Sequence, residues 1–166
     1  MHYMLKRVYL RKKSKKTPTY QFHEKQHNFL KYWRVVKYYI KDKYEISDSV
    51  LEMLLFLYDE NVFTKATFNE FARTMSWDKD RFSKLVQAGF IKKWRDRKQT
   101  QRSSLWELTI KSKRICNHLY KKLTQEEEIS ENPYRNDIFK GNSHMDRVYK
   151  DIIRAMNAKT RSHNET

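Results

Sequence analysis

The sequence predicts a mainly α-helical domain that carries one small β-hairpin. Only two Gly and two Pro occur among the 166 residues, and so few turn-forming residues favour helices over a sheet-rich fold. Apolar side chains recur at helical spacing through most of the chain, whereas residues 90–95 and 104–109 are two short apolar runs around a charged turn. That combination is typical of a helical core with a hairpin attached.

Residues 1–22 are expected to form a basic arm, and residues 23–166 the folded domain. Seven Lys or Arg crowd the arm before Pro18, and repulsion between like charges favours a flexible segment. A long helix is expected over about 24–44, because apolar residues recur there at intervals of four, three and four. These residues are Phe29, Trp33, Val36 and Ile40.

This first helix has a wide apolar surface, because Tyr32, Val35 and Tyr39 lie on an adjoining face. A helix that packs against one neighbour needs a single stripe, so the width indicates two neighbours. A second copy of the chain is one candidate. The next two helices are expected to start near Ser47–Ser49 and at Thr67, where residues with capping-box spacing occur. The motif residues are Ser49 with Glu52, and Thr67 with Glu70.

A fourth helix is expected between Asp78, which can cap it, and Gly89, which follows it at the position where a positive φ is tolerated. The hairpin comes next, followed by a helix at about 110–124. Asn132-Pro133 breaks the chain before a last helix at about 144–158. The apolar stripe of this last helix contains Met145, Val148, Tyr149, Ile152 and Met156.

From Thr67 to Leu123 the expected order is a short helix, a second helix, a basic hairpin and a further helix. This is the order of a winged helix-turn-helix, here with additional N- and C-terminal helices. The positive charge is concentrated in two parts of this order. Residues 1–46 carry 13 Lys/Arg against 3 Asp/Glu, and residues 76–124 carry 14 against 4, whereas the segments 47–75 and 125–166 are slightly acidic. Charge gathered in two blocks indicates an anionic polymer as partner.

The fourth helix is expected to read DNA. When its apolar residues pack inward, Ser83, Lys84 and Gln87 face outward, with Lys79 and Arg81 on the flanks. Gln87 can pair with adenine and Lys84 can donate to guanine in the major groove. A merely solvated polar face accounts for this helix about equally well when it is considered alone.

The hairpin adds a cluster of cations. A wing of this kind is expected to lie along phosphates or to reach into the minor groove, although a solubilising surface loop is an alternative. The expected wing contacts are Lys92, Lys93, Arg95, Arg97, Lys98, Gln101 and Arg102. Arg11, Lys12 and Lys13 of the arm are expected to follow the DNA backbone beside them.

Residues 29–124 resemble the MarR family of winged-helix transcriptional regulators. The resemblance rests on Ser47-Asp48 leading into an apolar run, on the segment Lys84–Ile91 with its Gly89, and on Leu108-Thr109 at the start of the next helix. Arg102 falls at the second arginine of the family's Asp-Arg-Arg wing motif. The resemblance implies a transcriptional regulator that binds double-stranded DNA.

The resemblance also implies a homodimer joined through the first and last helices, which reads two half-sites about one helical turn apart. The expected interface residues are Phe29, Tyr32, Trp33, Val36, Tyr39, Met145, Tyr149, Ile152 and Met156. Many members of the family bind a small ligand such as a phenolic compound, but no residue here identifies an effector.

Two other functions compete with this one. Tyr and Trp near cations also suit stacking on single strands, so a single-strand, RNA or sequence-neutral coating protein is the second hypothesis. His23-Glu24-Lys25-Gln26-His27 fits the H-E-x-x-H motif of zinc peptidases. The motif lies at a helix start beside a charged arm, so it is expected to bind no catalytic metal.

No enzyme activity, cofactor or metal is therefore expected. Two glycines leave little material for phosphate-cradling loops. Cys116 is the only cysteine, which excludes an intrachain disulfide and favours a reducing compartment. No apolar run reaches the roughly 18 residues of a membrane helix, and the N-terminal segment lacks the apolar region of a signal peptide. A cytoplasmic protein without membrane contact is expected.

Overall fold

A computed structural model describes residues 29–164 of the chain, except 76, 79 and 96–102. Within these residues the chain is mainly helical and has one three-stranded antiparallel sheet, which confirms the expectation of a mainly α protein with a hairpin. The elements in order are α1 (Phe29–Tyr44), α2 (Asp48–Tyr58), β1 (Phe63–Thr64), α3 (Lys65–Met75), α4 (Arg81–Gln87), β2 (Ile91–Arg95), β3 (Leu105–Leu108), α5 (Ile110–Leu123), α6 (Asp137–Lys140) and α7 (His144–Asn164).

The helix α2 begins within the expected Ser47–Ser49, whereas α3 begins two residues before the expected Thr67. Ser47 caps α2, because its Oγ accepts a hydrogen bond from the Val50 amide at 3.3 Å. Thr64 Oγ1 accepts from the Thr67 amide at 3.1 Å, and α3 begins directly after it. Ser49 and Thr67, the residues with capping-box spacing, lie inside these helices. In both cases the true cap lies at the residue where extended backbone ends.

The start of α4 also differs, and its end agrees with the expectation. The backbone carbonyl of Asp78, not its carboxylate, accepts from the Arg81 amide at 3.1 Å. Gly89 has a φ of +71° and follows the last turn. The Gly89 amide donates to Val86 O at 3.0 Å and the Phe90 amide to Leu85 O at 2.9 Å, which is the Schellman pattern of a glycine-terminated helix.

The sheet has the strand order β1-β3-β2, so β3 lies in the centre. Ile91 pairs with Leu108 and Lys93 with Trp106 across the hairpin, while Phe63 pairs with Trp106 on the other side of β3. The strand β1 was not expected, because its two residues are too short to show a period. It attaches the hairpin to the start of α3.

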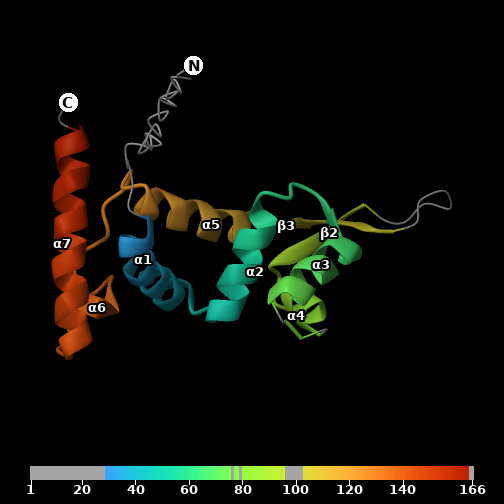
Figure 1. Ribbon diagram of the computed structural model, residues 1–166, viewed down its shortest axis with the longest axis horizontal. Coiled ribbons are helices and arrows are strands. Elements are labelled where there is room, and N and C mark those ends of the chain that lie inside the picture. The colour runs from blue at the N-terminus through green and yellow to red at the C-terminus, as the bar shows by residue number, and fades with distance from the viewer. Residues whose placement is uncertain (1–28, 76, 79, 96–102, 165–166) are drawn as a thin grey trace, which may run out of the picture.

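The core is continuous from α1 to the sheet, and α5 runs along its length. Figure 1 shows α2, α3, α4 and the sheet at one end of the molecule and α7 at the other, with α5 between them. The helix α1 packs against α5 and also against α6 and α7. No helix in the described part of the chain combines the length and the apolar character that crossing a membrane requires.

The second neighbour of the wide apolar face on α1 is therefore in the same chain. Five of the expected interface residues are buried by this packing, namely Tyr32, Val36, Tyr39, Tyr149 and Met156. Phe29 and Met145 remain exposed, and Trp33 and Ile152 are half-buried. The surface left on α1 and α7 for a second copy is correspondingly narrower than the sequence pattern indicates.

Candidate nucleic-acid interface

The helix α4 presents one apolar and one polar face. Phe82 and Leu85 are buried, whereas Ser83, Lys84 and Gln87 are exposed. The Phe82 ring lies 5.2 Å from that of Phe68 on α3 and 5.0 Å from that of Trp106 on β3. These edge-to-face contacts fix α4 on both α3 and the sheet, so its polar face is held on a rigid support.

Two ammonium groups flank this aromatic support. Lys65 Nζ lies 5.7 Å from the Phe82 ring centroid, and Lys93 Nζ lies 5.7 Å from the Trp106 ring centroid. Because Phe82 and Trp106 pack against each other, cations from α3 and from β2 lie close to α4. Lys65 was missed in the sequence, because its position at the start of α3 depends on the unexpected strand β1.

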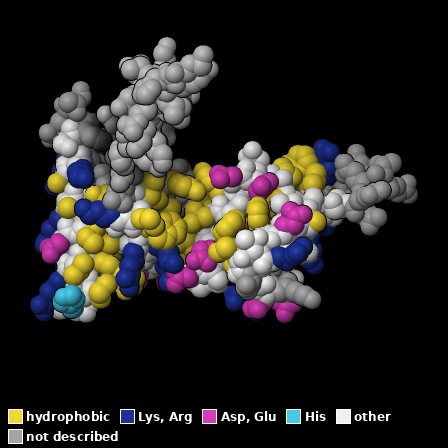
Figure 2. All heavy atoms as spheres, viewed as in Figure 1, with side chains coloured by type: hydrophobic (Ala, Val, Ile, Leu, Met, Phe, Trp, Pro, Cys, Tyr) yellow, Lys and Arg dark blue, Asp and Glu magenta, His cyan; other side chains and the backbone are white. Residues whose placement is uncertain are grey.

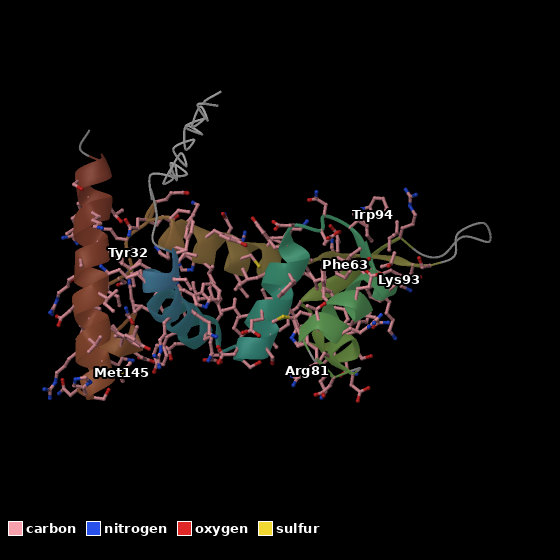
Figure 3. All side chains as sticks on the ribbon, in the orientation of Figure 1. Tyr32, Phe63, Arg81, Lys93, Trp94 and Met145 are labelled. Atoms are coloured by element: carbon pink, nitrogen blue, oxygen red, sulfur yellow. The ribbon has the colours of Figure 1, made fainter. Side chains whose placement is uncertain are left out.

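The other face of the hairpin is different in character. Successive side chains of a strand alternate between its faces, and Figure 3 shows Trp94 and Lys93 on different sides of β2. Lys92 forms an ion pair with Glu107 at 3.1 Å, and Lys113 reaches the same carboxylate at 3.4 Å. The hydrogen bond from Lys92 is the main cause of the lowered pKa of Glu107. A phosphate contact by Lys92 has to compete with this pair.

Trp94 is exposed over 46% of its surface, and the Arg95 guanidinium lies 4.6 Å from its ring centroid. An exposed indole beside a cation is a surface on which a nucleobase can stack. Trp94 was not among the residues expected in the site. Only Ile91 of β2 is buried, and the register with β3 shifts between Lys93 and Arg95, so the exposure of Trp94 depends on a local irregularity that the sequence does not show.

Arg81 is half-buried and holds α4 in place. Its Nη1 donates to Ser49 Oγ on α2 at 3.4 Å, and its Nη2 lies 3.5 Å from an Asp78 carboxylate oxygen. These contacts brace the start of α4 against α2. Arg81 was expected on the DNA-facing flank, and its side chain has this bracing role in addition.

Several predicted contacts lie outside the described residues. They are Arg11, Lys12, Lys13, Lys79, Arg97, Lys98, Gln101 and Arg102, together with His23, Glu24 and His27 of the H-E-x-x-H motif. Among the described residues, no group of three or more His, Cys, Asp or Glu is placed to hold a metal ion. Cys116 is buried, and burial raises the pKa of its thiol to about 12, so it remains an unreactive thiol at neutral pH.

The described cations therefore gather around α4 from three elements. Figure 2 shows dark-blue Lys and Arg side chains beside the hairpin and over the region of α3 and α4, with acidic side chains among them. Lys65, Lys84 and Lys93 contribute one cation each from α3, α4 and β2. Comparison of the chain with protein-family models, with curated proteins and with solved structures found no match.

Proposed function

We propose that this protein is a winged helix-turn-helix that binds double-stranded DNA and regulates transcription. The observation that carries the proposal is the order α2-β1-α3-α4-β2-β3, with β1 paired to the last strand of the hairpin. In this assignment α3 and α4 are the helix-turn-helix, α4 is the recognition helix, and the β2–β3 hairpin is the wing. The resemblance of residues 29–124 to MarR-family regulators agrees with this assignment.

The dimensions of α4 suit the major groove. An α-helix with its side chains is about 10–12 Å across, and the groove is roughly 12 Å wide. Ser83, Lys84 and Gln87 share the exposed face, so all three can approach base edges together. Lys65 and Lys93, beside the aromatic rings that support α4, would contact the phosphates that border the groove.

Replacing Gln87 with Ala tests base readout. A bidentate contact to a base contributes roughly 1–3 kcal/mol of discrimination, so the variant should lose about 5- to 150-fold of its preference for one base pair. Its affinity for other sequences should stay the same. The preference is measured by competition between the best-bound duplex and single-base variants of that duplex.

Asn117→Ala, at an exposed amide on α5 away from the proposed groove, is the control and should leave the preference unchanged. An equal loss of affinity for every sequence after Gln87→Ala would contradict base readout by α4.

The exposed apolar residues of α7 are the proposed contact with a second copy of the chain. Met145 and Val148 are 41% and 37% exposed, one helical turn apart, and Phe29 is exposed on α1. Met145→Glu with Val148→Glu should give a monomer by sedimentation equilibrium, since two charges cannot be buried unpaired at an interface. The thermal stability of the variant should stay unchanged. Tyr134→Glu, at a side chain that is also exposed, is the control. A dimeric double variant would exclude this face.

Single-strand or RNA binding is the second candidate. The exposed Trp94 ring with Arg95 beside it favours it, because base stacking on an aromatic ring is tolerant of sequence. Binding of this kind would use the face of the hairpin that α4 does not share. Trp94→Leu distinguishes the candidates, because it should weaken single-strand binding selectively if Trp94 is a stacking residue.

A further inference from the structure

A polar cavity lies at the end of α5 that is remote from the hairpin. Its volume is about 560 Å³, and it is bounded by α1, by the C-terminal half of α5 and by the segment 127–135. In Figure 1 this is the end of α5 near α1 and α7. The proposed DNA interface uses none of its side chains.

We propose that this cavity binds a small molecule through an oxyanion, a phosphate or a carboxylate group. The groups assigned to the anion are the side chains of Lys43 and Arg135, with the hydroxyls of Tyr39 and Ser130 and the imidazole of His118 as further polar contacts. This cavity is separate from the proposed DNA interface, so anion binding here does not depend on DNA binding.

The two carboxylates at the cavity are already neutralised. Glu127 Oε1 lies 2.7 Å from Lys121 Nζ and Glu127 Oε2 lies 3.1 Å from Lys122 Nζ. The hydrogen bonds from these lysines, Lys121 first, lower the pKa of Glu127 to about 2. Glu128 forms a two-pronged ion pair with Arg161 on α7, at 2.8 and 2.9 Å. Neither glutamate is left to balance a further cation.

Lys43 and Arg135 are the cations without a carboxylate. Among the described residues, neither side chain forms an ion pair. Lys43 Nζ instead lies 3.4 Å from the Tyr39 hydroxyl and about as far from the Tyr39 and Tyr44 rings as a cation–π contact allows, at 5.6 and 6.0 Å. Within the part of the chain that the structure describes, the cavity therefore has two positive charges without a paired carboxylate.

Lys122 makes this arrangement rigid. It is only 6% exposed, and its ammonium donates to Glu128 O at 2.6 Å as well as to Glu127. A buried ammonium costs free energy unless it is paired and hydrogen-bonded, so the segment 127–128 is fixed against α5. The walls of the cavity are thus already formed before a ligand binds.

The imidazole of His118 lies among the same lysines. Burial first, and then the charges of Lys43 and Lys122, lower the pKa of its imidazole to about 4, although Glu127 acts in the opposite direction. Tyr44 Oη lies 3.1 Å from His118 Nδ1, so the ring is held in one orientation. Burial also raises the pKa of Tyr39, whose hydroxyl therefore remains a donor at neutral pH. These groups suit an anion with hydrogen-bond acceptors.

The size of the cavity indicates more than a free phosphate. Pockets for small organic ligands begin at roughly 300 Å³, and this cavity exceeds that volume. The half of the ligand that carries no charge would lie against the ring of Tyr39. The occupant is therefore a small metabolite with an oxyanion at one end.

Thermal unfolding with defined anions tests the proposal. Inorganic phosphate, pyrophosphate and citrate are compared at pH 7 with sodium chloride of the same ionic strength. At least one of them should raise Tm saturably, because a ligand that binds only the folded state stabilises it. A higher affinity for phosphate or pyrophosphate assigns a phosphate group, and a higher affinity for citrate assigns a carboxylate. Tm values that follow ionic strength alone would overturn the proposal.

Two variants locate the effect. Lys43→Gln and Arg135→Gln should each weaken the effective anion about tenfold, which corresponds to about 1.4 kcal/mol. Arg147→Gln, an exposed cation on α7, is the control and should leave the affinity unchanged. The side chains of Lys43 and Arg135 are exposed, so the Lys43→Gln and Arg135→Gln variants should fold.

If Arg147→Gln weakens anion binding as much as Lys43→Gln and Arg135→Gln do, the anion responds to the net charge of the protein. That result would overturn the proposed site. A loss of DNA affinity in Lys43→Gln and Arg135→Gln without any effect of the small anions would assign the cavity to the nucleic-acid surface instead. That outcome would overturn this proposal but not the DNA-binding function.

Discussion

Replacing Arg97, Lys98 and Arg102 together with Ala should lower the slope of log K against log salt for duplex binding by about 2.7. Each phosphate contact on duplex DNA contributes about 0.9 to this slope, because it releases condensed counterions. The three side chains belong to the basic stretch that joins β2 to β3. Affinity at low salt should fall strongly, and thermal stability should change little. Fluorescence anisotropy with a labelled duplex at a series of salt concentrations measures both affinity and slope.

A variant with the same loss of charge elsewhere is the control. Lys140→Ala, Arg147→Ala and Arg154→Ala remove three cations from α6 and α7, at the opposite end of the molecule from the hairpin. The slope of log K against log salt for this control should stay close to that of the unchanged protein. An unchanged slope in the hairpin variant would remove the wing from the proposed interface, and an equal fall in both would mean that the net charge alone attracts DNA.

Asn157→Ala should lower the free energy of unfolding by about 3 kcal/mol. Asn157 is 1% exposed, and its amide pairs with both backbone groups of Ile129 at 2.9 Å. It also donates to Glu131 Oε1 at 2.8 Å. Truncation leaves the buried amide and carbonyl of Ile129 without partners, and each unsatisfied group costs about 1–3 kcal/mol. Urea unfolding followed by circular dichroism measures the loss.

Two further substitutions test the cause of that loss. Asn157→Asp keeps an acceptor for the Ile129 amide but places a carboxylate against the Ile129 carbonyl and Glu131, so it should also be strongly destabilising. Asn117→Ala, at an exposed amide on α5, should change stability by less than about 0.5 kcal/mol. If Asn157→Ala costs no more than Asn117→Ala, the pairing with Ile129 does not hold α7 on the domain.

The local sequence predicts the elements around the proposed recognition helix well. The inward face of α4 follows from the spacing of Phe82 and Leu85, and its end follows from Gly89, whose φ of +71° few other residues adopt without strain. The hairpin follows from two short apolar runs. These features depend on residues within a few positions of one another, which periodicity and turn chemistry describe directly.

Features that depend on residues far apart in the chain could not be predicted from local periodicity and turn chemistry. The two-residue strand β1 exists because β3 offers it a pairing edge, and α6 has only four residues. Whether a serine or threonine caps a helix depends on where the preceding extended backbone ends. For this reason the caps of α2 and α3 are Ser47 and Thr64. Periodicity does show that α1 has two neighbours, but it contains no information on which chain supplies the second one.

The polar contacts of the tertiary structure are similarly invisible in the sequence. Asn157 meets Ile129 across 28 positions, and Arg81 meets Ser49 across 32. Lys65 joins the proposed interface through the aromatic contact between α4 and β3, not through a sequence motif. The cavity at Lys43 and Arg135 likewise combines three segments that are remote in the chain.

Binding to labelled duplex DNA, single-stranded DNA and RNA of the same sequence, followed by fluorescence anisotropy from about 50 to 400 mM salt, tests the central claim most directly. A winged helix-turn-helix that reads duplex DNA predicts the tightest binding to the duplex, with a steep fall in affinity as salt increases. Equal or tighter binding to a single strand or to RNA, or no binding to any of the three, would contradict it.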